Sequence, residues 1–151
     1  MSSISMSGSD TIKINSRILA DLASGDVGVL TFPNELANIK TGKNGNSIYS
    51  FNETGRQAEL SIRLLRGSSD DKYLSSQLAS MKNNFAGFTL MTGELIKRIG
   101  DGTGKIISDT YIMSGGVFSK ELDAKSNTDG DSEQSLVTYV IRYSNSPRII
   151  E

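Results

Sequence analysis

The change of periodicity within residues 57–85, QAELSIRLLRGSSDDKYLSSQLASMKNNF, decides the expected fold. The first nine residues alternate between apolar and polar side chains, a period of two that indicates a β-strand. The apolar face comprises Ala58, Leu60, Ile62 and Leu64, and the polar face comprises Glu59, Ser61 and Arg63. Apolar side chains then recur at helical spacing, which predicts an amphipathic helix. This helix packing stripe consists of Leu74, Leu78, Met81 and Phe85.

The start of this helix is also marked in the sequence. Ser68 followed by Asp71 resembles a capping box in which Asp replaces the usual Glu. Two consecutive acidic residues, Asp70 and Asp71, favour the positive end of the helix dipole. This is the one helix that the sequence predicts.

The segments on both sides of the strand–helix unit read as further strands. They are residues 11–19, 27–32, 93–99, 105–113 and 136–143, with weaker alternation in 35–41. Glycines at 100, 102 and 104 predict a hairpin turn between the third and fourth of these strands. The last strand places Val137, Tyr139, Ile141 and Tyr143 on one face, with Thr138 and Arg142 on the other. The predicted fold is mainly β: an antiparallel β-sandwich or partial barrel with one packed α-helix.

A chain of 151 residues predicts a single domain, residues 1–151. The Ser-rich residues 1–10 are expected to form a flexible N-terminal arm, and residues 145–151 a short C-terminal tail. Residues 1–10 lack the charged and apolar regions of a secretory signal, and no apolar run approaches the ~20 residues of a membrane span. We therefore expect a protein made in a cytoplasm that does not insert into membranes.

Composition excludes several kinds of chemistry. The chain has neither Cys nor His, so it can build no thiol or Ser-His-Asp nucleophile and no Cys or His metal site. Sixteen basic residues against seventeen acidic ones give a net charge of −1 without a basic stripe. Because affinity for nucleic acids depends mainly on clustered Lys and Arg, this balance disfavours specific DNA or RNA binding.

Two local motifs imitate ligand-binding loops. Residues 99–105, IGDGTGK, depart from the phosphate-binding loop, since Ile99 stands where its first Gly belongs and Ile106 where its Ser or Thr belongs. A hairpin turn is the better interpretation. Residues 127–133, NTDGDSE, place oxygen ligands at alternate positions, but Gly130 comes too early for a calcium-binding loop. A solvated loop is favoured there.

Two further patterns also favour their plain interpretation. Residues 52–54, NET, form a glycosylation sequon that is not used without secretion. Glu94 and Asp109 could face each other across a hairpin as an acid–base pair, but a solvated strand face is the better interpretation. The sequence therefore predicts no enzyme, no catalytic residue, no metal and no cofactor.

Residues 42–55, GKNGNSIYSFNETG, form the most unusual stretch of the chain. We interpret it as a long loop without periodicity of its own, a type that is commonly functional or disordered. Tyr49 and Phe51 argue against plain disorder, because disordered segments are poor in aromatics. The loop either folds back on its own domain or contacts another subunit.

Residues 31–74 resemble the tail tube proteins of contractile-tailed bacteriophages. The most specific part is KTGKNGNSIYSFNETGRQAE, residues 40–59, and RGSSDDKYL at 66–74 looks like the strand-to-helix junction of that family. The likeness covers the middle third of the chain closely, and the rest matches mainly in length and strand order. Related tubes occur in phage-tail-like bacteriocins and secretion machines.

The resemblance implies a ring-forming tail-tube fold. Six subunits would form a ring whose sheets join into a continuous barrel, and rings would stack into a hollow tube that conducts DNA without binding it specifically. Tail sheath and baseplate proteins would be the other partners, within a virion assembled in the bacterial cytoplasm.

Two sets of residues are candidates for assembly contacts. The hypothesis for the contact between rings names Lys43, Asn44, Asn46, Tyr49, Phe51 and Arg56, with the two aromatics as anchors. The hypothesis for the channel wall or the seam between subunits names Glu59, Ser61, Arg63, Thr138 and Arg142. The alternatives are a tube-like baseplate or adaptor ring and a monomeric β-sandwich that binds glycans or proteins. The absence of Trp weakens the glycan version.

Overall fold

The computed structural model describes residues 2–6, 11–22, 28–100, 102–124 and 135–150. The first half contains β1 (Ser2–Met6), β2 (Thr11–Ile14), β3 (Arg17–Ile18), β4 (Gly28–Phe32), β5 (Ala37–Thr41), β6 (Ser47–Phe51), the 3-10 helix η1 (Glu53–Arg56) and β7 (Ala58–Leu65). The second half contains α1 (Ser69–Asn83), β8 (Met91–Gly100), β9 (Ile106–Phe118), β10 (Asp123–Ala124), β11 (Leu136–Asn145) and β12 (Arg148–Ile150).

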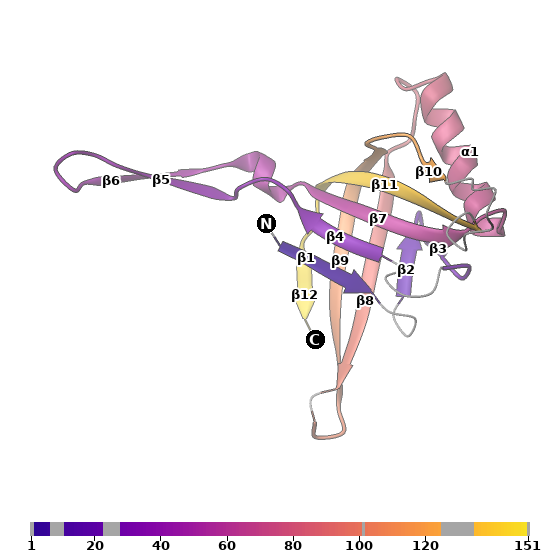
Figure 1. Cartoon of the computed structure of the whole chain (residues 1–151). Helices are drawn as coiled ribbons and strands as arrows, with labels where there is room; N and C mark the ends of the chain where they lie inside the picture. Colours follow the sequence, from indigo (N-terminus) through magenta and orange to yellow (C-terminus); the bar gives the residue numbers. More distant parts are fainter. Residues whose placement is uncertain (1, 7–10, 23–27, 101, 125–134, 151) are drawn as a thin grey trace, which may run out of the picture.

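The strands form one large antiparallel sheet and one small one (Figure 1). The large sheet runs in the order β1-β4-β7-β11-β9-β8-β2-β3, with β10 added to β11 and β12 added to β9. Its described strands end at β1 on one side and β3 on the other, so the sheet is not a closed barrel. The small sheet is the β5–β6 pair. The predicted class, mainly antiparallel β with one helix, is confirmed.

Strand β7 lies between β4 and β11, and its alternation is the predicted one. Ala58, Leu60, Ile62 and Leu64 are fully buried in the core. The side chains between them are half-buried on the opposite face. Because every second residue enters the core, a shift of register by one residue would expose this whole apolar row.

Helix α1 covers the core at the end of β7 (Figure 1). Its start is as predicted: the Ser68 side chain accepts a hydrogen bond from Asp71 N, and the Asp71 carboxylate accepts one from Gly67 N. Leu74 and Leu78 are buried, and Met81 is partly buried against the core.

The prediction for Phe85 was wrong, because the helix ends at Asn83, before the position that the apolar spacing requires. Asn84 leaves the helical conformation with φ −150° and ψ 79°. Its side-chain oxygen then accepts a hydrogen bond from Gly87 N. Phe85 consequently lies beyond the helix, with 66% of its surface exposed.

Residues 11–19, predicted as one strand, form the β2–β3 hairpin instead. Asn15 and Ser16 make the turn with φ of 52° and 66°, a conformation that Asn tolerates better than most residues. The Asn15 amide donates to Tyr73 Oη at 3.1 Å, and its oxygen accepts from Thr92 N at 2.9 Å. The turn is therefore fixed both to α1 and to β8.

A buried carboxylate joins this hairpin to the helix. Asp70 is only 1% exposed, and its Oδ2 accepts hydrogen bonds from Ala20 N at 2.7 Å and Asp21 N at 2.8 Å. Its Oδ1 accepts from Arg17 Nε at 3.1 Å. The Arg17 guanidinium also lies 5.0 Å from the centre of the Tyr73 ring. Asp70 thus serves a tertiary contact in addition to the helix end.

Both ends of the described chain carry strands where an arm and a tail were expected. Ser2–Met6 pair with β4, although residues 1–10 were predicted as a flexible arm. Arg148–Ile150 pair with β9, within the expected tail 145–151. Arg148 holds Asp109 in a two-point ion pair, with distances of 2.7 and 2.8 Å. These edge strands are short, and each is defined by its pairing with a strand distant in the sequence.

Two core tyrosines differ in the hydrogen bonding of their hydroxyl groups. Tyr139 Oη donates to the Asp71 carboxylate at 2.6 Å, whereas Tyr143 Oη has no hydrogen-bond partner among the described residues. The Tyr143 ring lies directly on two glycines: a Cβ at Gly116 would come 2.5 Å from the ring, and one at Gly93 would come 2.6 Å from Oη. Burial raises the pKa of both tyrosines, and Asp71 raises that of Tyr139 further.

Tyr143→Phe is expected to leave the free energy of unfolding at pH 7 unchanged or up to about 1 kcal/mol higher, because it removes a buried hydroxyl that makes no bond. Tyr139→Phe should lower it by about 1.5–3 kcal/mol, because a hydrogen bond to a charged group is lost. Urea denaturation of both variants checks this pair. A loss above about 2 kcal/mol in Tyr143→Phe would contradict the assignment.

Tyr143→Phe should also change how the free energy of unfolding depends on pH in alkaline solution. A raised pKa keeps the folded tyrosine protonated where the unfolded one, with a pKa near 10.0, has lost its proton. Stability from this source is complete below pH 10 and falls as the pH rises further, since the unfolded chain then binds fewer protons. Tyr143→Phe should therefore show a shallower loss of stability above pH 10.

Candidate functional site

Residues 37–51 form a β-hairpin that projects from the body of the molecule (Figure 1). The prediction of a long loop over residues 42–55 was wrong, because Ser47–Phe51 pair with Ala37–Thr41 over their full length. Only residues 42–46 form the tip, where Gly45 has a φ of +84° and its N–H donates to Gly42 O at 3.0 Å. We refer to residues 37–51 as the projecting hairpin.

The register of the projecting hairpin separates its side chains into two different faces. Directly paired residues share a face in an antiparallel ribbon, and successive pairs alternate. The apolar face carries the paired residues Ala37 and Phe51, and Ile39 and Tyr49. The opposite face carries Asn38, Lys40, Ile48 and Ser50. The hairpin is thus amphipathic although all ten of its strand residues are exposed.

The apolar face has no cover within the described chain. Ile39 is 65% exposed, Tyr49 73% and Phe51 52%. A two-stranded ribbon is only marginally stable in water, and a contiguous exposed apolar patch commonly marks an interaction site. The face is therefore the strongest candidate for a functional surface on this molecule.

The base of the hairpin is held firmly to the body. Asn52 N donates to Leu36 O at 2.8 Å, and the Asn52 side chain accepts from both Thr54 N and Thr54 Oγ1. Gly55 is buried, and a Cβ there would come 2.6 Å from Leu36 Cα. Only glycine fits where η1 packs against the backbone of Glu35 and Leu36. The NET sequon therefore has a structural place, with Asn52 as the N-cap of η1 and Glu53 and Thr54 within it.

Arg56 connects this base to the apolar face. Its guanidinium lies 5.4 Å from the centre of the Phe51 ring, and its Nε lies 3.3 Å from the Glu53 carboxylate. The ring is thus oriented by a cation contact, and the charge of Arg56 is already balanced within the chain.

The six residues predicted for the contact between rings all fall on the hairpin or its base. Lys43, Asn44 and Asn46 lie in the tip, Tyr49 and Phe51 on the apolar face, and Arg56 in η1. Sequence reasoning missed Ile39, which pairs with Tyr49. The Asn44-Gly45 dipeptide is a hairpin signal that could have revealed this pairing.

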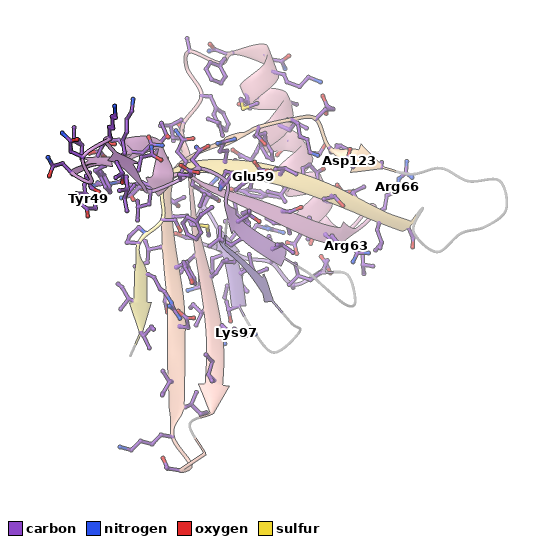
Figure 2. The ribbon with its side chains drawn as sticks, turned by 60° about the vertical axis from the view of Figure 1, so that its left-hand side comes forward. Tyr49, Glu59, Arg63, Arg66, Lys97 and Asp123 are labelled. Carbon is purple, nitrogen blue, oxygen red and sulfur yellow. The ribbon has the colours of Figure 1, made fainter. Side chains whose placement is uncertain are left out.

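The residues predicted for a channel wall or seam gather on one face of β7 and β11, opposite the core. We call this the outer strand face: Glu59, Ser61, Arg63, Thr138 and Arg142. Arg63 pairs with Thr138, and Glu59 pairs with Arg142, whose Nη1 lies 3.7 Å from the Glu59 carboxylate. Figure 2 shows Glu59 and Arg63 along β7, apart from Tyr49 on the hairpin. The face is polar and half-buried, with one carboxylate and two guanidinium groups.

The described residues offer no site of the other kinds considered. Among them, no three Asp or Glu side chains gather closely enough to hold a metal ion. Glu94 pairs with Ile112, and Asp109 pairs with Lys97 and binds Arg148, so the two carboxylates do not face each other. Gly102 and Gly104 have positive φ in the turn between β8 and β9. Residues 127–133 lie outside the described residues.

Helix α1, the one α-helix of the described residues, is too short and too polar to cross a membrane.

Comparisons of sequence and structure give different results. No family model matches the sequence, and no curated protein matches it. Solved structures do match the fold, and each of three covers 94% of this chain. One is from the PVC sheath–tube complex of an extracellular contractile injection system in its extended state, with 8% identity, 87% of that chain covered and a TM-score of 0.62.

The other two are terminating components of such particles. The tube-terminating cap of the anti-feeding prophage matches with 7% identity, 88% of that chain covered and a TM-score of 0.59. The sheath/tube terminator of the PVC system, also in the extended state, matches with 9% identity, 92% coverage and a TM-score of 0.57. At such low identity the likeness concerns the fold. It is the fold of phage-tail-like tube particles, in agreement with the resemblance of residues 31–74.

Proposed function

We propose that this protein is the tube subunit of a contractile phage tail or a related injection machine. It assembles with copies of itself into rings of six, and the rings stack into a hollow tube that conducts DNA. Its role is structural rather than enzymatic. The tube forms in the bacterial cytoplasm and becomes part of a particle with sheath and baseplate proteins as partners.

The uncovered apolar face of the projecting hairpin is the observation that carries this proposal. Ile39, Tyr49 and Phe51 are exposed and lie outside the core cluster, on a ribbon that projects from the body (Figure 1) and cannot cover them itself. A surface of this kind needs a partner, and the fold shared with tube and terminator structures supports a second copy in a neighbouring ring.

The open edges of the sheet support ring formation in the same way. Within the described chain, β1 and β3 each have a free side on which another strand can pair. Open edges invite pairing between chains, and a closed ring of subunits removes them. In that arrangement the outer strand face lines the channel or the seam between subunits. Its pairing of Glu59 with Arg142 leaves a polar wall without strong positive charge, which would not hold back DNA phosphates.

The second candidate is a ring that ends or adapts a tube without extending it. This alternative is favoured by the likeness to the tube-terminating cap and the sheath/tube terminator, whose TM-scores of 0.59 and 0.57 are close to the 0.62 of the sheath–tube match. Such a subunit would make the same lateral contacts and lack one of the axial ones.

Size-exclusion chromatography and negative-stain microscopy of the purified protein test these functions together. A tube subunit is expected to give filaments with a central channel, and end views should show six-fold rings. Discrete rings that do not elongate at high concentration would favour the terminator or adaptor. A protein that stays monomeric at high concentration would contradict both functions and would favour the alternative of a monomeric β-sandwich that binds glycans or proteins.

A further inference from the structure

A pocket of about 510 Å³ lies where the projecting hairpin joins the body. It is formed between the end of β4, the base of the hairpin and the turn that follows β11, and we call it the base pocket. Phe32 and Leu36 supply apolar walls, and Glu35, Arg56 and Ser146 supply polar groups. This volume falls within the range of about 300–1,000 Å³ that proteins use for compact ligands, so an aromatic side chain fits it.

Two polar groups in the base pocket lack partners. Ser146 is 8% exposed, and its hydroxyl makes no hydrogen bond among the described residues. The Glu35 side chain is exposed, and no ion pair or hydrogen bond holds it within the described chain. Arg56 is already paired with Glu53. A buried hydroxyl is rarely left unbonded, and an exposed carboxylate attracts a cation, so the pocket is suited to an occupant that brings an apolar body and a polar end.

The projecting hairpin has these properties, but it cannot reach the pocket of its own chain because it extends away from it (Figure 1). Tyr49 is its most exposed aromatic residue and combines an apolar ring with a hydroxyl. Residues 37–51 contain two cations, Lys40 and Lys43, and no acidic residue. This positive charge complements the free carboxylate of Glu35.

We propose that the base pocket of one copy receives Tyr49 from the projecting hairpin of a second copy, with Lys43 directed to Glu35. The inference rests on the proposed assembly into stacked rings and identifies the surface that accepts the hairpin. Donor and acceptor are different parts of the same chain, so the contact is head-to-tail, and in the proposed stack of rings it repeats along the tube axis without closing. Each ring then presents hairpins on one side and base pockets on the other, which gives the tube its polarity.

Complementation between two defective variants tests this directly. The donor variant Ile39→Ala/Tyr49→Ala keeps its pocket, and the acceptor variant Glu35→Lys/Asn145→Trp keeps its hairpin. Asn145 is exposed and lines the pocket, so Trp fills the pocket without entering the core. Each variant alone should need a concentration about tenfold higher or more to form filaments. Mixed together they should form one junction, a discrete species of doubled mass that does not elongate.

A charge exchange provides a second readout with smaller side-chain changes. Glu35→Lys and Lys43→Glu should each weaken filament formation, and the variant with both changes should recover most of it. Wild-type protein is the reference in every experiment. If it forms no filaments, the proposed function fails first. If it forms filaments and the acceptor variant does so equally well while the donor variant does not, the hairpin docks elsewhere and the base pocket inference is wrong.

Discussion

Replacing Tyr49 and Phe51 together by alanine is expected to abolish tube growth while the subunit stays folded. Both side chains lie on the apolar face and outside the core cluster, so the fold does not depend on them. Buried aromatic anchors at interfaces contribute about 2 kcal/mol or more each. Losing two of them corresponds to about a thousandfold weaker contact for each pair of subunits. Because a ring makes several such contacts at once, the effect on stacking is larger still.

The measurement compares the double variant with the wild type by sedimentation and negative-stain microscopy, and monitors the fold by circular dichroism and thermal unfolding. The matched control is Ile48→Ala/Ser50→Ala, which removes side chains from the opposite face of the same hairpin. The control variant should form tubes of nearly normal length, unlike Tyr49→Ala/Phe51→Ala. Tubes of normal length from Tyr49→Ala/Phe51→Ala would show that the apolar face is not the contact between rings.

The parts of the fold that the sequence predicted are those with one buried face. Strand β7 and helix α1 were both recognised because burial imposes a period on their apolar residues. The end of the helix was missed since it depends on the conformation of one residue, Asn84, and on its hydrogen bond to Gly87 N. Apolar spacing carries no information about such a local stop, and it therefore extended the helix to Phe85.

The projecting hairpin was missed for the opposite reason. Both of its faces are exposed. Ile48 directly precedes Tyr49 in the sequence, and these two apolar side chains lie on opposite faces, so β6 shows no clear alternation of apolar and polar residues. The residue types still indicated an interface, because aromatics among Asn and Gly are unusual in a solvated loop. The residue types thus supported the hypothesis of an interface, while the pairing of the two strands was not recognised. The base pocket could not, since it joins residues near 35, 55 and 146 that meet only in the folded chain.

Edge strands show the same limit. Ser2–Met6 and Arg148–Ile150 are strands because β4 and β9 offer them a free side. Asp70 belongs to this class of long-range features. From the sequence alone, Asp70 is interpreted only through the dipole of α1. In the structure its carboxylate also accepts hydrogen bonds from backbone N–H groups about fifty residues earlier in the chain.

Asp70→Ala is expected to be the most damaging single substitution in the subunit. It leaves Ala20 N and Asp21 N without their acceptor and removes the partner of Arg17, in a position that is 1% exposed. Removing one member of a buried, hydrogen-bonded charge cluster costs about 3–5 kcal/mol. In a chain of this size that corresponds to a fall of about 10 °C in the melting temperature. Asp70→Asn should lose less, because one oxygen acceptor is kept.

Thermal and urea unfolding of the non-assembling Tyr49→Ala/Phe51→Ala background separate this loss from any effect of assembly. Asp123→Asn is the control, because that carboxylate is exposed and forms only a surface ion pair with Lys120. Hydrogen exchange at Ala20 and Asp21 gives the local readout, since both amides are bonded to Asp70. If Asp70→Ala unfolds like the control and these amides stay protected, the β2–β3 hairpin is held to α1 by Asn15 and Tyr73 instead.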